Sequence, residues 1–261
     1  MAIITLTTDL GNKDHYAGVV KGNIFKLCPN AIIIDITHQI APFNILEAAF
    51  TVKNSYAEFP EGSIHIIGVN PDSKKDVIHL AIEHNGHYFI GSDNGIFSLI
   101  FDEKPQRIFQ LDIMSSYEGS SFPIKEIYTK AASHIANGGT LEMIGKPKQD
   151  ILEKSLFRAL SVGDIIKGMV THIDHYGNII TNIEKDFFTV FGMNRDFVIE
   201  FRDGSYDINT ISTSYSDVAE GEKLALFSSS KLLEIAINQG NASKLLGIRN
   251  LDSIRIMFHD R

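Results

Sequence analysis

Short apolar runs alternate with helical patterns over the first 150 residues. The apolar runs of strand length are Ile3–Thr7, Ala31–Ile36 and Ser63–Val69. The second run lacks polar alternation, which predicts a strand buried on both faces. Apolar residues at helical spacing predict a helix over His15–Leu27, and Asn44 is placed to cap another that runs to about Tyr56. This order predicts a mainly parallel sheet flanked by helices.

The rest of this half contains a hairpin and two more helices. Asn85-Gly86 lies between Val77–Glu83 and Tyr88–Ile90, a strong hairpin pattern. A short helix is predicted over Asn94–Phe101 and a longer one over Ile124–Ala136.

The pattern changes after about Ser161, where short β-rich runs dominate. They are Gly168–Ile173, Asn178–Ile183, Phe197–Phe201, Lys223–Phe227, Leu232–Ile237 and Ser253–Phe258. Many short strands separated by turns are typical of a small barrel or sandwich. We therefore predict an α/β domain over residues 1–161 and an all-β barrel domain over residues 162–261.

Composition excludes several classes of protein. The net charge is -8 and no cluster of Lys or Arg forms a nucleic-acid footprint, so no nucleic-acid partner is expected. No apolar stretch approaches the ~20 residues of a membrane span, and the start is too short and uncharged for a signal peptide. The single cysteine, Cys28, fits a reducing compartment and a buried structural thiol. We expect a cytoplasmic protein without a membrane partner.

The first candidate site follows the first predicted strand. Asp9 lies between that strand and Gly11, at an edge where open α/β sheets collect ligands. A carboxylate there can accept hydrogen bonds from both hydroxyls of a ribose. Asp14 lies at the helix start, where it caps the helix or reaches the same ligand. The alternative is that both are ordinary turn and cap residues.

The second candidate site is the turn from Asp174 to Asn178, which places an acid, an imidazole, an aromatic ring and an amide together. Asp174 and Asn178 can bind an amine and a carboxylate, and Tyr176 can stack on a flat base. The alternative is a polar β-turn with Gly177 at positive φ. Ser229 lies in a serine triplet that offers hydroxyls and amides, which is weak evidence alone.

Common cofactor motifs are missing from the chain. His65, His79, His84 and His87 are scattered and form no zinc pattern. There is no GxGxxG, GxxxxGK[ST] or GxSxG sequence, so we expect no dinucleotide cofactor, no metal and no hydrolase elbow.

Five short segments with candidate residues are spread in order along nearly the whole chain. They are Thr7-Thr8-Asp9-Leu10-Gly11, Ile34-Asp35-Ile36-Thr37-His38, Gly91-Ser92-Asp93-Asn94-Gly95, Ile173-Asp174-His175-Tyr176-Gly177-Asn178 and Leu233-Glu234-Ile235-Ala236. This ordered set resembles the S-adenosylmethionine hydroxide adenosyltransferases, also called S-adenosylmethionine hydrolases, which are related to fluorinase and chlorinase. The resemblance implies an N-terminal α/β domain, a C-terminal β-barrel and a homotrimer with ligand sites at subunit interfaces.

The resemblance also implies roles for individual residues. Asp9 would hold the ribose hydroxyls and Phe43 would line the ribose pocket. Asp174 and Asn178 would bind the methionine part or the adenine, with Tyr176 as an aromatic wall and Ser229 at the amino-acid end. S-Adenosylmethionine would be substrate or ligand, attacked at ribose C5′ by hydroxide or halide.

The chain departs from the family at the residues that prepare water for attack. Asn70 stands where the family has Asp, Pro123 stands where it has His, and Lys74 or Lys75 is nearest to its Arg. Neither Asn nor Pro takes up a proton at neutral pH. Asn70 and Lys75 are the catalytic candidates. Other possible ionisable groups are Asp72, Asp76 and Glu126.

Three functions follow from these observations. The first is cleavage of S-adenosylmethionine to adenosine and methionine by a rearranged mechanism. The second is a protein that binds or senses adenosine or S-adenosylmethionine without converting it. A halogenase-type substitution is the weakest, because Ile124 stands where a halide pocket uses a serine hydroxyl.

Overall fold

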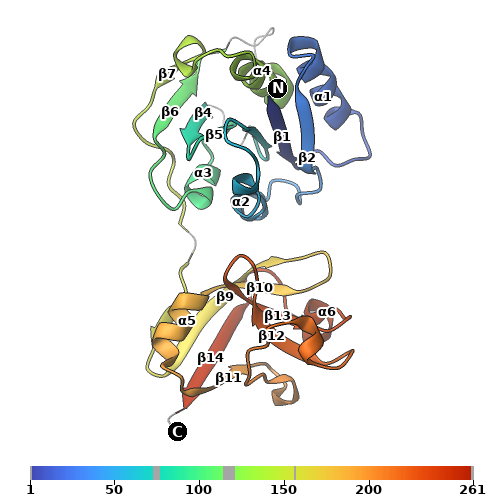
Figure 1. The fold of residues 1–261 in the computed structure, drawn as a ribbon, viewed down its shortest axis with the longest axis vertical. Helices are drawn as coiled ribbons and strands as arrows, with labels where there is room; N and C mark the ends of the chain where they lie inside the picture. Colours follow the sequence, from blue (N-terminus) through green and yellow to red (C-terminus); the bar gives the residue numbers. More distant parts are fainter. Residues whose placement is uncertain (1, 73–76, 114–120, 156, 260–261) are drawn as a thin grey trace. The chain divides into compact units, whose positions relative to one another are not determined.

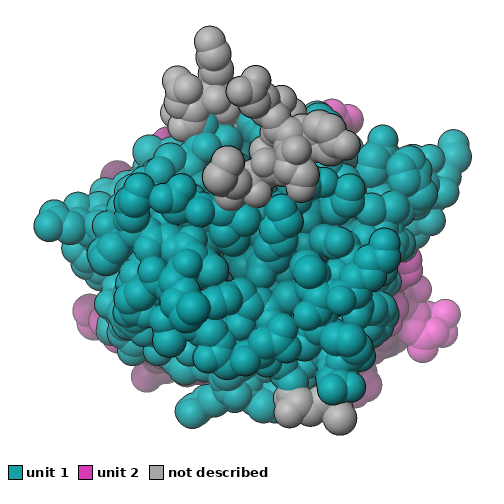
Figure 2. Space-filling model, turned by 90° about the horizontal axis from the view of Figure 1, so that it is seen from above, with its two compact units in different colours: residues 1–155 teal, residues 156–261 magenta. Residues whose placement is uncertain are grey.

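The structure is a computed structural model that describes residues 2–72, 77–113, 121–155 and 157–259 (Figure 1). The chain forms two compact units, residues 1–155 and 156–261, shown in teal and magenta in Figure 2. The predicted boundary at 161/162 lies slightly later, because the short strand β8 (Leu160–Val162) pairs with β9 of the second unit. No helix in the described part of the chain is long and apolar enough to cross a membrane.

The first unit is built on a seven-stranded sheet in the order β2-β1-β3-β5-β4-β6-β7. Its strands are β1 (Ile3–Thr8), β2 (Ile32–Thr37), β3 (Ile64–Gly68), β4 (His79–His84), β5 (His87–Ser92), β6 (Arg107–Leu111) and β7 (Gly145–Pro147). β2, β1, β3 and β5 pair in parallel, whereas β4, β6 and β7 pair antiparallel. The predicted mainly parallel sheet is therefore only partly parallel, since the β4–β5 hairpin reverses the chain direction.

Helices cover both faces of this sheet, as Figure 1 shows. They are α1 (Tyr16–Leu27), α2 (Ile45–Lys53), η1 (Tyr56–Glu58), α3 (Ile96–Ile100), η2 (Ile124–Tyr128), α4 (Thr129–Ala136) and η3 (Leu141–Met143). One buried core joins α1, η2 and α4 to the sheet through Leu6, Ile66 and Tyr128. The other joins α2 and α3 through Ile67, Leu80 and Phe89. Cys28 is buried in the first core, as predicted.

The β-branched run predicted to be buried on both faces forms β2, which is half-exposed. Ile32 is 41% exposed. This expectation was wrong because β2 is the first strand of the sheet, with β1 as its neighbour. An apolar, non-alternating sequence does not distinguish an edge strand from a central one.

The second unit is a curled antiparallel sheet in the order β11-β14-β9-β10-β13-β12. Its elements are β9 (Ile165–Ile173), β10 (Ile179–Glu184), α5 (Lys185–Gly192), β11 (Asp196–Glu200), η4 (Gly204–Tyr206), η5 (Tyr215–Asp217), β12 (Lys223–Phe227), β13 (Leu232–Ile237), α6 (Ala242–Leu246) and β14 (Ser253–His259). The two end strands are each joined to one connecting segment, through the bridges Ile199–Ile208 and Ser212–Leu226. The sheet is thus a half-barrel whose edges this short segment links.

Gly68, at the end of β3, allows η2 to pack closely on the sheet. A Cβ atom at this position would lie 2.5 Å from Ile124 Cδ1 and 2.9 Å from Ile124 Cγ1. We predict that Gly68→Ala lowers the free energy of unfolding of the first unit by about 1–3 kcal/mol through overpacking. Gly18→Ala is the control, because a Cβ in that part of α1 meets no atom within 4 Å. It should raise stability by about 0.5–1 kcal/mol. Urea unfolding measures both, and equal effects would contradict the packing argument.

Candidate functional site

Asp9 lies at the carboxyl edge of the parallel strands, where three loops meet. Its Oδ2 atom accepts a hydrogen bond from the Phe43 N–H at 2.9 Å and a longer one from the Asn70 N–H at 3.4 Å. Asp9 follows β1, Phe43 follows β2 and Asn70 follows β3. In the part of the chain that the structure describes, the hydrogen bonds to this carboxylate use Oδ2. Oδ1 is therefore the oxygen placed to accept from a ligand.

Both residues that donate to Asp9 have unusual backbones. Phe43 has φ 66° and Asn70 has φ 47°. A positive φ is costly for a bulky side chain such as Phe, and such strain concentrates at binding sites. The Phe43 side chain is also 70% exposed. The Asp9 hydrogen bond thus helps to hold an aromatic ring at the surface beside the carboxylate.

Asn94 fixes the loop that carries Asn70. Its buried amide donates to the carbonyl oxygens of Val69 at 3.1 Å and Asn70 at 3.0 Å, while its Oδ1 accepts from the Ile96 N–H. One side chain therefore ties the end of β3 to the start of α3. Three of its four hydrogen-bonding positions are used, which makes Asn94 a structural support of the site.

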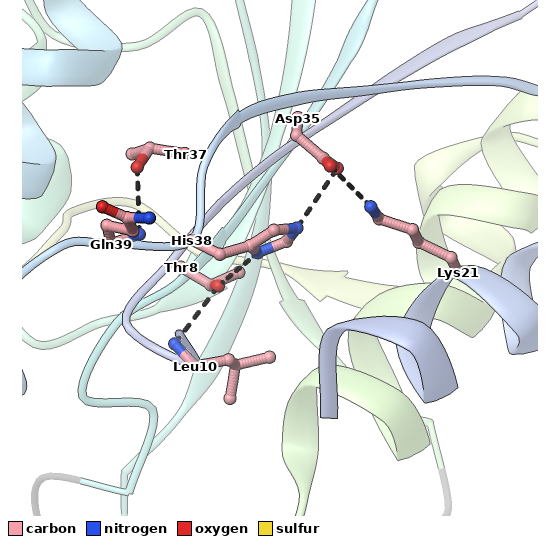
Figure 3. A network of polar contacts seen from close by, with 7 residues as sticks. All are labelled: Thr8, Leu10, Lys21, Asp35, Thr37, His38 and Gln39. Atoms are coloured by element: carbon pink, nitrogen blue, oxygen red, sulfur yellow. Dashed lines mark hydrogen bonds and ion pairs between the residues drawn. The ribbon is translucent and has the colours of Figure 1, made fainter. Parts of the chain in front are cut away.

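A buried histidine links the loops that follow β1 and β2 (Figure 3). His38 Nδ1 lies 2.7 Å from Thr8 Oγ1, and this hydroxyl also accepts from the Leu10 N–H at 3.3 Å. His38 Nε2 lies 3.1 Å from Asp35 Oδ1, a close approach outside hydrogen-bond geometry. Lys21 reaches from α1 to the other Asp35 oxygen. The chain on both sides of Asp9 is therefore anchored through Thr8.

The second candidate cluster is a closed turn in the second unit. The Asn178 N–H donates to Asp174 Oδ1 at 2.9 Å, and its side-chain amide donates to Oδ2 at 3.1 Å. Gly177 has φ 87°, and a Cβ there would overlap the Asn241 side chain. The positive φ that the polar β-turn alternative gives to Gly177 is confirmed. Tyr176 is 72% exposed, and its ring packs edge-on against His175.

A buried acid lies close to the same turn. The Tyr215 hydroxyl donates to Glu234 Oε1 at 2.5 Å, and Glu234 is buried on β13. Burial raises the pKa of the Glu234 carboxyl, and the negative charge of Asp174 raises it further, against the lowering effect of the Tyr215 hydrogen bond. Burial, together with the Glu234 and Asp174 charges, raises the pKa of Tyr215 too. Asp174 therefore adds negative charge to a cluster that contains the Glu234 carboxyl and the Tyr215 hydroxyl.

Family models match both units of the chain. The SAM hydroxide adenosyltransferase N-terminal domain matches residues 4–145, and the C-terminal domain matches residues 168–255. The chain belongs to the SAM hydroxide adenosyltransferase family.

Individual relatives agree with this membership. A protein named (R)-S-adenosyl-L-methionine hydrolase from Methanocaldococcus jannaschii is 32% identical over 98% of this chain and 96% of its own length. A fluorinase from Actinopolyspora mzabensis is 22% identical over 97% and 96% of the two chains. A crystal structure of an uncharacterized conserved protein from Thermotoga maritima superposes with a TM-score of 0.87 at 28% identity, covering 98% and 100%.

Several other residues that the sequence analysis singled out lie outside the Asp9 and Asp174 clusters. Asp14 is exposed, and the N-cap position of α1 is His15, so the expected capping role of Asp14 was wrong. Ser229 is exposed in the turn between β12 and β13. Lys74, Lys75 and Asp76 lie outside the described residues. Pro123 is buried at the start of η2, and Asp72 is exposed after β3.

Sequence reasoning missed a polar pair inside the first unit. His79 Nδ1 lies 2.9 Å from the hydroxyl of Tyr128, which is fully buried. Burial lowers the pKa of His79 and raises that of Tyr128. The two residues are 49 positions apart, and no local motif marks either one. Only the packing of η2 on the sheet brings them together.

The Thr8–His38 contact should be worth more than the ion pair beside it. We predict that His38→Ala lowers the free energy of unfolding of the first unit by about 1–3 kcal/mol, because the buried Thr8 hydroxyl then keeps only the longer hydrogen bond from the Leu10 N–H. Lys21→Ala removes a partly exposed ion pair and should cost at most about 1 kcal/mol. Urea unfolding of the two variants compares these contributions. A larger loss from Lys21→Ala would contradict the proposed anchoring of the Asp9 loop.

Proposed function

We propose that this protein hydrolyses S-adenosylmethionine to adenosine and methionine. The observation that carries the proposal is Asp9, a carboxylate fixed by amides of two further loops at the carboxyl edge of the sheet. Family membership over both units and relatives named (R)-S-adenosyl-L-methionine hydrolase support the same reaction. The proposed substrate is a sulfonium nucleoside, and no cofactor is required.

Asp9 has the chemistry needed to hold a ribose. An ionised carboxylate only accepts hydrogen bonds, and the two lone pairs of its Oδ1 atom match two neighbouring hydroxyl donors. The amides of Phe43 and Asn70 orient the carboxylate before the ligand arrives. This lowers the entropy lost on binding, because the acceptor geometry already exists. Phe43 is proposed to cover the sugar with its exposed ring.

The Asp174 turn is proposed to bind the methionine end or the adenine. Each Asp174 oxygen accepts one hydrogen bond from Asn178, and a carboxylate oxygen has a second lone pair for a ligand N–H. The negative charges of this cluster favour the ammonium group of the amino acid. Tyr176 is proposed as an aromatic wall and Ser229 as a hydroxyl contact.

The reaction is a displacement at ribose C5′. A water oxygen forms a bond to C5′ while the C5′–S bond breaks, and its electron pair stays on sulfur in the neutral thioether of methionine. Sulfonium is already an activated leaving group, so the protein's main tasks are to place water in line and to accept a proton.

We further propose a cytoplasmic homotrimer with a closed C-terminal barrel. Light scattering after size-exclusion chromatography measures the number of subunits.

Asp9→Asn tests the proposed function directly. We predict that wild-type protein releases adenosine from one or both sulfonium epimers of S-adenosylmethionine. Liquid chromatography measures the adenosine that is formed. Asp9→Asn should lower kcat/KM by about 100-fold or more, because an amide replaces one acceptor oxygen with a donor that leaves ribose hydroxyls unpaired.

Asp102→Asn is the matched control, since it makes the same chemical change at an exposed carboxylate of the same unit. It should keep wild-type activity. No adenosine above the buffer blank at pH 6–9 would overturn the hydrolase proposal. Ligand-dependent thermal stabilisation without turnover would instead identify a binding protein.

A further inference from the structure

The chain departs from the family pattern in two segments, at Asn70 and at Pro123. A hydrogen bond joins the ends of these two segments. Asn70 begins the segment that leads into β4, and His79 is the first residue of β4. Pro123 precedes η2, and Tyr128 is the last residue of η2. The His79–Tyr128 contact therefore connects the ends of the segments where Asn and Pro replace the expected Asp and His.

His79 also lies at the same edge of the sheet as Asp9. It pairs with Ser92 at the carboxyl end of β5, and Thr8 pairs with Gly68 at the carboxyl end of β3. Ile67 of β3 pairs with Gly91 of β5, so these pairs continue one row across the sheet. At about 4.8 Å per strand, His79 lies roughly 10 Å from Gly68, the residue two before Asn70.

The pair forms a polar cluster inside an otherwise apolar layer. Tyr128 is packed among apolar residues of the first core, and the buried Ser92 hydroxyl lies beside the same phenol oxygen, outside hydrogen-bond geometry. A buried phenol needs a partner, and His79 supplies it. In the tautomer with its proton on Nδ1, the His79 ring donates to Tyr128 and leaves a lone pair on Nε2.

We propose that His79 accepts the proton of the attacking water and that Tyr128 is the positioning residue that fixes the His79 ring. This inference rests on the proposed hydrolase function. The water oxygen bonds to C5′, the C5′–S electron pair goes to sulfur, and the released proton passes to His79 Nε2 and then to solvent. Asn70, whose loop Asn94 holds, orients the water or substrate without taking up a proton.

The charged neighbours of the pair define how the rate depends on pH. Among the described residues, Tyr128 faces His79 from η2, and the Asp72 charge, from the segment after β3, raises the pKa of Tyr128. Burial is the cause that lowers the pKa of His79 below 6.5, so the ring is neutral at pH 7 and able to accept a proton. The rate should fall as the pH drops through this lowered pKa.

The experiment compares pH profiles of kcat/KM between pH 4.5 and 9. The variants are His79→Gln and its matched control His84→Gln, a buried histidine with a lowered pKa at the other end of β4. His79→Gln should lower kcat by about 10²–10⁴-fold with a smaller change in KM, and should abolish the acid limb. His84→Gln should keep the wild-type kcat and the acid limb of the pH profile. Added imidazole should restore part of the rate of His79→Ala, and Tyr128→Phe should shift the acid limb.

Each outcome separates this inference from the function on which it rests. An active wild type without an acid limb, or a His79→Gln profile equal to that of the wild type, would overturn the role of His79 and leave the hydrolase proposal intact. Loss of the acid limb in Asp72→Asn, but not in His79→Gln, would assign the proton to Asp72 instead. An inactive wild type would overturn both. The wild-type limb is measured without any substitution, so a variant that does not fold still leaves a decisive result.

Discussion

One oxygen atom of Asp9 receives backbone N–H groups from two different loops. This shared hydrogen bonding joins the chain after β1 to the chain after β2 and after β3. Two of these loops contain a non-glycine residue at positive φ, a conformation that needs support from its surroundings. The carboxylate thus completes the folded edge of the sheet. In the proposed function the same group also presents an acceptor to the ligand.

Support for Asp9 extends outward through side chains of different kinds. His38 and Thr8 anchor the neighbouring backbone on one side, and Asn94 holds the Asn70 loop on the other. These groups are buried and hydrogen-bonded, so they resist movement better than exposed ion pairs do. The surroundings of Asp9 are therefore held by buried contacts, whereas the Phe43 and Tyr176 side chains are exposed.

The sequence predicted those helices, strands and site residues that neighbouring residues in the chain determine. Asp9 and the Asp174 turn were identified because each directly follows a strand, and Cys28 was assigned to the core by its apolar surroundings. Nonlocal properties were not predictable. Residues Lys185–Gly192 include three Phe, one Thr and one Val, a composition that suits a strand. They nevertheless form α5, because Phe187, Phe188 and Phe191 pack on the core of the half-barrel. The His79–Tyr128 pair depends on how two layers meet, which no local spacing encodes.

The antiparallel direction of β4 has a consequence for how this fold diversifies. Residues that end parallel strands and residues that begin antiparallel ones reach the same edge of the sheet, and each is held by its own ladder of hydrogen bonds. Asn70 and His79 are therefore fixed independently, although they are only one short connection apart. Insertions or deletions in that connection leave both anchor points in place. In the proposed function, evolution can therefore exchange the groups that prepare the nucleophile while the edge of the sheet that carries Asp9 stays unchanged.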